Sequence, residues 1–157
     1  MTNKQNEAIQ KIERIIHDLK TNGRRTIKYI GRIPESVECG NKYPAVFIEE
    51  GNEDYSWDGN VVAGQVSYEY ELNLYLHHNI EKNRVEEINK IQNKINTAIL
   101  QDLSLRNVVA YSRLISVEKG SLQNNEYSKE DVNQAGYYAN NTVRKMTFRF
   151  WILDTRR

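Results

Sequence analysis

Apolar and polar residues alternate with period two along residues 65–77, which is the clearest pattern in the chain. The even positions from Val66 to Leu76 are apolar or aromatic, and the odd positions are polar apart from Tyr75. Successive side chains of a strand point to opposite faces, so this segment is predicted to be a strand with one face on the core and one solvated polar face. At about 3.3 Å per residue it would span roughly 43 Å, so one end is expected to project beyond the sheet.

Two other segments repeat their apolar residues at spacings of three and four, which predicts amphipathic helices over 4–20 and 80–102. The first apolar stripe runs from Ala8 to Leu19, and the second runs from Val85 to Ile99. Thr21, Asn22 and Gly23 follow the first helix and are expected to end it, with Gly23 as a left-handed cap.

Shorter apolar or alternating runs predict strands over 25–33, 43–49, 108–118 and 143–153, with long loops over 50–64 and 119–142. The predicted order is helix, strand, strand, long strand, helix, strand, long loop, strand. Two helices can cover one face of such a sheet. The sequence therefore predicts one α+β domain over 1–157, a two-layer structure with both helices on one face of a mostly antiparallel or mixed five-stranded sheet.

Composition narrows the function classes. The 157 residues suit one domain, and 22 Lys and Arg against 21 Asp and Glu argue against a dedicated duplex-DNA binder. Cys39 is the single cysteine, which excludes an intramolecular disulfide framework and a cysteine-rich zinc site. No apolar run is long enough to span a membrane and the first residues do not resemble a signal peptide, so we expect a cytoplasmic setting without membrane contact.

The near-neutral total conceals an acidic segment. Residues 41–80 carry Lys42 against seven acids, and the densest stretch is 49–58. Two interpretations stay open for this stretch: a solvated loop, or an acidic surface that meets a basic partner or repels nucleic acid.

Catalytic and metal-binding patterns are weak. His77 and His78, with Glu81, form the best metal-binding candidate, but adjacent strand residues point to opposite faces and cannot easily share one ion. Glu69 and Glu71 share the polar face of the long strand, where a magnesium-dependent nuclease could use them, although a solvated face is the favoured interpretation. We therefore predict no catalytic residues, no metal and no cofactor.

Aromatic residues are more informative, because Tyr and Trp are enriched at protein interfaces. Several lie in the two long loops, and loop 119–142 is longer than a connector in a compact domain requires. An interface between chains is favoured over a mobile surface for these aromatic residues: Tyr55, Trp57, Tyr127, Tyr137 and Tyr138.

The layout resembles the phage tail terminator family, also called tail completion or tail-to-head joining proteins. The resemblance spans nearly the whole chain. It rests on the opening helix, the strand Tyr43-Pro44-Ala45-Val46-Phe47-Ile48, the long strand ending Leu74-Tyr75-Leu76, the helix 88–100, the strand 108–117, the long loop, the closing strand Lys145-Met146-Thr147-Phe148-Arg149-Phe150 and the basic end Arg156-Arg157.

This resemblance implies a structural virion protein, not an enzyme, that needs no cofactor. Such proteins are assembled in the host cytoplasm into a hexameric ring on the head-proximal end of the tail tube. The ring stops tube polymerisation and offers a surface to the neck or head-completion protein, and genomic DNA passes through its lumen without sequence-specific binding. Three alternatives remain: a head-completion or neck connector protein, a small metal-dependent nuclease, and an unrelated cytosolic α+β binding module.

In such a ring, acidic side chains that face the lumen would let DNA slide by repelling its phosphates. We expect the acidic residues to face either the lumen or the tail tube, and the aromatic and terminal basic residues to lie at interfaces. The acidic candidates are Glu49, Glu50, Glu53, Asp54 and Asp58, and the terminal ones are Arg156 and Arg157.

Overall fold

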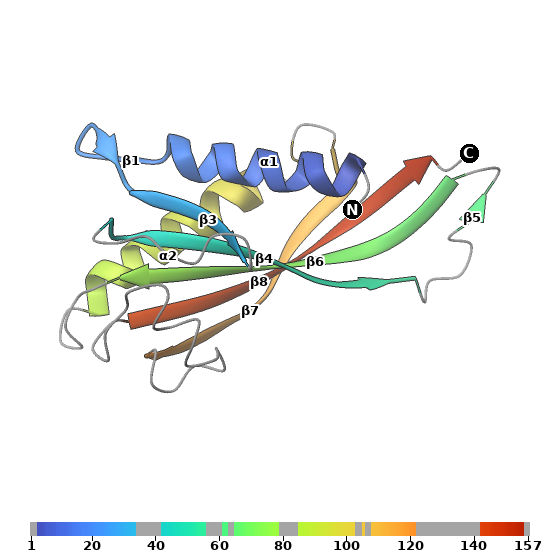
Figure 1. Ribbon diagram of the computed structural model, residues 1–157. Coiled ribbons are helices and arrows are strands. Elements are labelled where there is room, and N and C mark those ends of the chain that lie inside the picture. Colours follow the sequence, from blue (N-terminus) through green and yellow to red (C-terminus); the bar gives the residue numbers. More distant parts are fainter. Residues whose placement is uncertain are drawn as a thin grey trace.

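The computed structural model describes residues 3–33, 42–55, 61–62, 65–78, 85–102, 105, 108–121 and 142–155. Two helices lie on one side of a twisted sheet, which gives the two-layer α+β fold predicted from the sequence (Figure 1). The elements are α1 (Asn3–Asp18), β1 (Lys20–Thr21), β2 (Arg24–Arg25), β3 (Tyr29–Ile33), β4 (Ala45–Asp54), β5 (Val61–Val62), β6 (Gln65–His78), α2 (Val85–Gln101), β7 (Tyr111–Ser121) and β8 (Thr142–Thr155).

The main sheet has the order β3-β4-β6-β8-β7, and the two-residue strand β5 pairs with the start of β6. Strand β3 runs parallel to β4, and the other pairings are antiparallel, so the sheet is mixed. The long strand predicted over 65–77 is confirmed as β6, which pairs along its whole length with β8 from Gln65↔Thr155 to His78↔Thr142.

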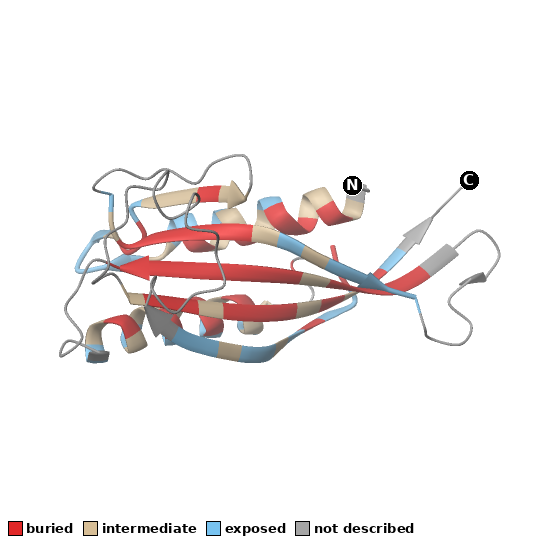
Figure 2. Ribbon diagram, turned by 60° about the horizontal axis from the view of Figure 1, so that its bottom comes forward, coloured by how far each residue is buried: buried red, intermediate tan, exposed pale blue. Residues whose placement is uncertain are grey.

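The core lies between the helices and one face of the sheet, the face that carries the even-numbered residues of β6 and β8. Side chains from α1 and α2 pack there against fully buried residues of β6 and β8, including Leu72 and Phe148. The predicted helical stripes and the alternation in β6 are thus confirmed over the described residues. Figure 2 shows buried central strands, whereas the second half of β4 and much of β7 are exposed.

The predicted helix cap at Gly23 is wrong. Helix α1 ends at Asp18, and Asn22 and Gly23 form the two-residue turn between β1 and β2. Both have positive φ, 53° and 79°, as a tight hairpin turn of the type favoured by Asn-Gly requires. The predicted strand 25–33 is consequently divided, and only its second half, β3, joins the main sheet.

The predicted loops also begin later than expected. Residues 50–54 continue strand β4 because β6 is long enough to pair with them, after a bulge between Glu50 and Glu53. Likewise, 119–121 belong to β7 and Thr142 belongs to β8. Residues 56–60, 63–64 and 122–141 of the two predicted loops lie outside the described residues.

The second face of the sheet is not the solvated polar face that the alternation predicted. Ser67, Glu69, Asn73 and His77 of β6 are all buried. Side chains of neighbouring strands contact some of these residues. Thr147 on β8, for example, donates a hydrogen bond of 2.8 Å to the Asn73 amide oxygen. A second small apolar cluster lies on this face, with Ala45, Phe47, Tyr75 and Val143.

Arg144 is an unusual member of the helix-facing side. It is 4% exposed, and its guanidinium donates to the Asn89 side-chain oxygen at 3.4 Å and to the Val143 carbonyl at 3.5 Å. Burial lowers the pKa of this arginine below its ordinary value. Among the described residues, its guanidinium hydrogen-bonds only to neutral acceptors. A buried cation in such surroundings costs free energy that an apolar side chain of similar length does not.

We therefore expect Arg144→Met to raise the free energy of unfolding by about 1 kcal/mol, measured by urea denaturation. Arg144→Ala is the control, because it removes the charge and also leaves a cavity, and it should stabilise less or destabilise. A clear loss of stability in Arg144→Met would show that the guanidinium contributes more than its desolvation costs.

Candidate interaction surfaces

The described part of the acidic stretch lies on β4 and forms an exposed edge of the sheet. It follows the point where β4 ceases to pair with β3. Strand β3 pairs with β4 only from Ala45 to Glu49, so the following residues have no β3 neighbour. Glu50, Glu53 and Asp54 are exposed along this part of β4. We call these three residues the acidic edge.

The carboxylates of Glu50 and Glu53 lie on the helix-facing side and accept hydrogen bonds from neutral groups. Glu50 accepts one from the Tyr70 hydroxyl, and Glu53 accepts one from the Gln5 amide and one of 2.9 Å from the Tyr55 hydroxyl. Burial raises the pKa of the Tyr70 hydroxyl, and Glu50 raises it further, so this hydroxyl remains a donor. These contacts position the carboxylates and leave their negative charge in place.

Glu49 belongs to the other face of the sheet. Its carboxylate accepts a hydrogen bond of 2.9 Å from the Tyr75 hydroxyl and a weaker one from the Asn73 amide. The predicted acidic surface is therefore divided between two faces. The alternating geometry of a strand separates these acids, although they are contiguous in sequence.

On the sheet face opposite the helices, two arginines of neighbouring strands lie beside the carboxylates of β6. The Glu69 carboxylate lies 3.8 Å from the guanidinium groups of Arg113 on β7 and Arg149 on β8. Arg149 also lies 3.5 Å from Glu71. A hollow of about 340 Å³ opens here, bounded also by Asn52, Glu53 and Asp54. Gly51 allows β4 to approach Glu71, since a Cβ at this glycine would lie 2.9 Å from the Glu71 carboxylate.

This arrangement weakens the nuclease interpretation. Two arginines already lie beside the carboxylates that would have to hold magnesium, and the repulsion between cations disfavours a metal ion there. Among the described residues, no group of three His, Cys, Asp or Glu side chains is placed to hold a metal. His77 and His78 point to opposite faces: His77 packs edge-on against Phe47 at 5.1 Å, and His78 lies 3.4 Å from Glu87. Glu81 and Cys39 lie outside the described residues.

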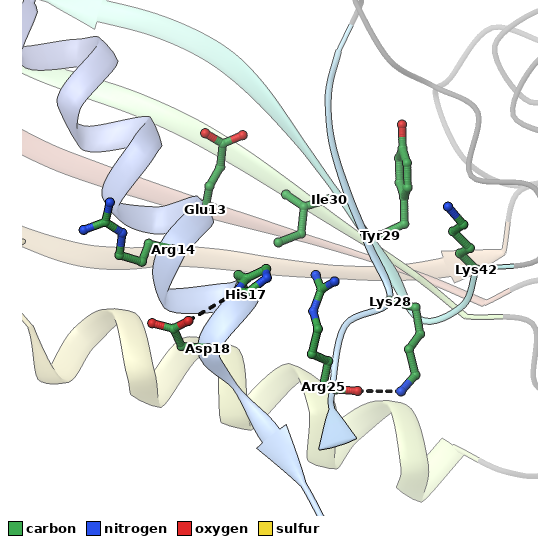
Figure 3. Close-up of a pocket in the computed structure, with 9 residues that line it drawn as sticks. All are labelled: Glu13, Arg14, His17, Asp18, Arg25, Lys28, Tyr29, Ile30 and Lys42. Carbon is green, nitrogen blue, oxygen red and sulfur yellow. Dashed lines mark hydrogen bonds and ion pairs between the residues drawn. The ribbon is translucent and has the colours of Figure 1, made fainter. Parts of the chain in front are cut away.

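Sequence reasoning missed a basic region at the opposite end of β4. Two adjoining hollows of about 630 and 710 Å³ share Arg25 and Lys28. The first lies between α1 and β3, as Figure 3 shows, and the second lies between the β1–β2 hairpin and α2. We call the Arg and Lys residues that line these hollows the basic end: Arg14, Arg24, Arg25, Lys28, Lys42, Lys90 and Lys94.

Signals for the basic end are present in the sequence but scattered. Arg24 and Arg25 are adjacent, and Lys90 and Lys94 have the spacing that places two residues on one face of a helix. The two pairs are far apart along the chain, and only the packing of α2 beside the hairpin brings them together. The Lys94 ammonium donates a hydrogen bond to the Lys20 carbonyl, which is the contact that joins them.

Tyr55 is the one aromatic interface candidate among the residues that the structure describes. Tyr55 stacks on Tyr68 with ring centres 4.8 Å apart, at the end of β4. Tyr111, which is 40% exposed, stacks on Trp151 across β7 and β8 at 6.1 Å. The other predicted interface and acidic candidates lie outside the described residues: Trp57, Asp58, Tyr127, Tyr137, Tyr138, Arg156 and Arg157.

Searches against protein-family models and against curated proteins give no match to this chain. In the parts of the chain that the structure describes, neither helix is long and apolar enough to cross a membrane.

Proposed function

We propose that this chain is a structural virion protein that forms a hexameric ring on the head-proximal end of a phage tail tube. In this role the ring ends tube polymerisation and presents a surface to the neck. The tail tube protein and a neck or head-completion protein are its partners, and genomic DNA passes through the lumen.

The observation that carries the proposal is the length of the β6–β8 ladder. Each strand has 14 residues and they pair throughout, so the ladder spans roughly 46 Å at about 3.3 Å per residue. The helices, of 16 and 17 residues, are only about 25 Å long at 1.5 Å per residue. The ladder therefore extends beyond the helical layer, as Figure 1 shows, and forms an arm that can reach a neighbouring subunit.

Other observations agree with an assembly role. Leu153 on the arm is 51% exposed, and the exposed Tyr111 lies beside Trp151 on the sheet face opposite the helices. Exposed aromatic side chains such as Tyr111 are enriched where proteins associate. The element order also matches the layout that carries the family resemblance.

Deletion of the gene from a phage or prophage that encodes this chain tests the proposal. We expect overlong or ragged tails beside separate filled heads in electron micrographs, because nothing would end tube growth. Complementation with the intact gene should restore tails of uniform length.

Two other outcomes would change the assignment. Normal tails beside unjoined or leaking heads would support the alternative, a head-completion or neck connector. Intact virions would contradict both structural roles. In that case, magnesium-dependent cleavage of DNA that is lost in Glu69→Gln would favour the nuclease.

A further inference from the structure

Cations of the basic end are not neutralised by nearby carboxylates in the described part of the chain. The Lys28 ammonium donates a 2.7 Å hydrogen bond to the Arg25 carbonyl, and the Lys94 ammonium donates to the Lys20 carbonyl and the Thr21 hydroxyl. All three acceptors are neutral. Three carboxylates line the hollows, and each has another partner. Glu13 pairs with Arg32, Asp18 lies 3.2 Å from His17, and Glu87 lies against His78.

Two carboxylates of the acidic edge likewise have neutral hydrogen-bond partners. Glu50 and Glu53 accept hydrogen bonds from two tyrosine hydroxyls and one amide, all of them neutral. The protein has a net charge of only +1, yet one end exposes cations and the other exposes carboxylates. Carboxylates with neutral hydrogen-bond partners, Glu50 and Glu53, thus lie at one end of β4. Cations with neutral partners, Lys28 and Lys94, lie at the other end.

Distance prevents these two surfaces from compensating one another within a protomer. Pro44 lines the second basic hollow directly before β4, and Glu53 lies near the far end of the strand. At about 3.3 Å per residue, the run from Pro44 to Glu53 spans roughly 30 Å. The Debye length at physiological ionic strength is about 8 Å, so the attraction across this distance is largely screened. Only a second molecule can bring the two surfaces into contact.

We infer that the basic end of one subunit binds the acidic edge of a second copy of this chain. Such a contact is head-to-tail, so every subunit uses both surfaces, and successive contacts close into a ring when the rotation between subunits allows it. The inference rests on the proposed ring and specifies its subunit interface. Complementary charge would also favour this head-to-tail arrangement over contacts between two basic ends or between two acidic edges.

Paired charge reversals test the contact. The first variant combines Arg24→Glu and Lys90→Glu, which reverse two exposed cations of the basic end. The second combines Asn52→Lys and Asp54→Lys, which place two cations beside Glu50 and Glu53 and keep both of these carboxylates. A control with the same change of charge as the first combines Lys11→Glu and Lys119→Glu, which lie outside both surfaces.

Association is measured with the purified full-length chain by light scattering on a sizing column and by sedimentation. The wild-type chain should form particles of about six times its 18.4 kDa mass, and it should dissociate as salt rises from about 50 to about 500 mM. Each reversal variant alone should weaken self-association about tenfold or more, because like charges then face one another.

An equimolar mixture of the two reversal variants gives the decisive result. In the mixture, the glutamates introduced at positions 24 and 90 can face the lysines introduced at positions 52 and 54. The next contact keeps the original residues on both sides, so the two variants can alternate around a six-membered ring. We expect the mixture to recover wild-type association, which also shows that both variants are folded. The control variant should associate like the wild type.

Four results would overturn the inference. Rings that form equally well in every variant would leave the proposed function standing and exclude this interface. A wild-type chain that stays monomeric at low salt would exclude the contact, as would reversal variants that lose association and do not recover it when mixed. Binding of a DNA oligonucleotide to the basic end, abolished by the first reversal, would assign that end to nucleic acid instead. The gene-deletion phenotype is independent of all these measurements.

Discussion

Replacement of Phe148 by alanine is expected to lower the free energy of unfolding by about 3–5 kcal/mol. The phenyl ring is fully buried at the centre of the sheet and faces the two helices. It lies opposite Leu72 on β6 and Leu114 on β7, and it stacks on Phe150 at 6.2 Å. Because three strands and the helical layer surround it, the cavity left by alanine cannot collapse easily.

Chemical denaturation followed by circular dichroism measures this loss. Leu153→Ala is the matched control on the same strand, because its half-exposed side chain should change stability by less than about 0.5 kcal/mol. Leu72→Ala should cost about 2–5 kcal/mol. The double variant should lose less than the sum, since the two residues face one another. Unchanged stability in both single variants would mean that the helix-facing side of the sheet is not the core.

The second large effect concerns the buried His77. Burial lowers its pKa from 6.5 to about 3, so the folded protein keeps the imidazole neutral. The unfolded chain binds a proton on this residue below about pH 6.5, and the folded chain does so only near pH 3. The stability contributed by the neutral ring is therefore complete above pH 6.5 and is lost as the pH falls toward 3.

At pH 5 this difference should cost about 2 kcal/mol relative to pH 7.5, measured by urea denaturation at each pH. His77→Leu removes the titrating group and should flatten the profile between these values, whatever its effect at neutral pH. If His77→Leu kept the full slope, another group would be responsible for it.

The successes of sequence-based prediction follow from local periodicity. The alternation in β6 and the apolar stripes from Ala8 to Leu19 and from Ile88 to Ile99 each record which side of an element is buried. A strand repeats every two residues and a helix every 3.6, so these patterns specify the element and its inner face together. The order of such elements then restricts the fold to two layers.

The failures arise where a neighbour distant in the sequence decides the outcome. Asn22-Gly23 suits either a helix end or a hairpin, and the packing of residues 24 and 25 back along β1 selects the hairpin. Residues 50–54 have a loop-like composition, yet pairing with β6 draws them into a strand. The alternation predicts a solvated side chain for Glu69. In the folded protein this side chain is buried, and Arg113 on β7 and Arg149 on β8 lie beside its carboxylate.

The sequence by itself determined the helices, the long strand, the helix-facing core and the near-neutral charge, because each depends on composition or on neighbours within a few residues. Only the tertiary structure decided where the charges lie. It gathered Arg24 and Lys90 at one end of β4, divided Glu49 from Glu50 between two faces, and left the acidic edge without a β3 neighbour. Strand pairing and helix packing bring together residues that are far apart in the chain. Local hydrophobic periodicity does not indicate which distant residues will be in contact.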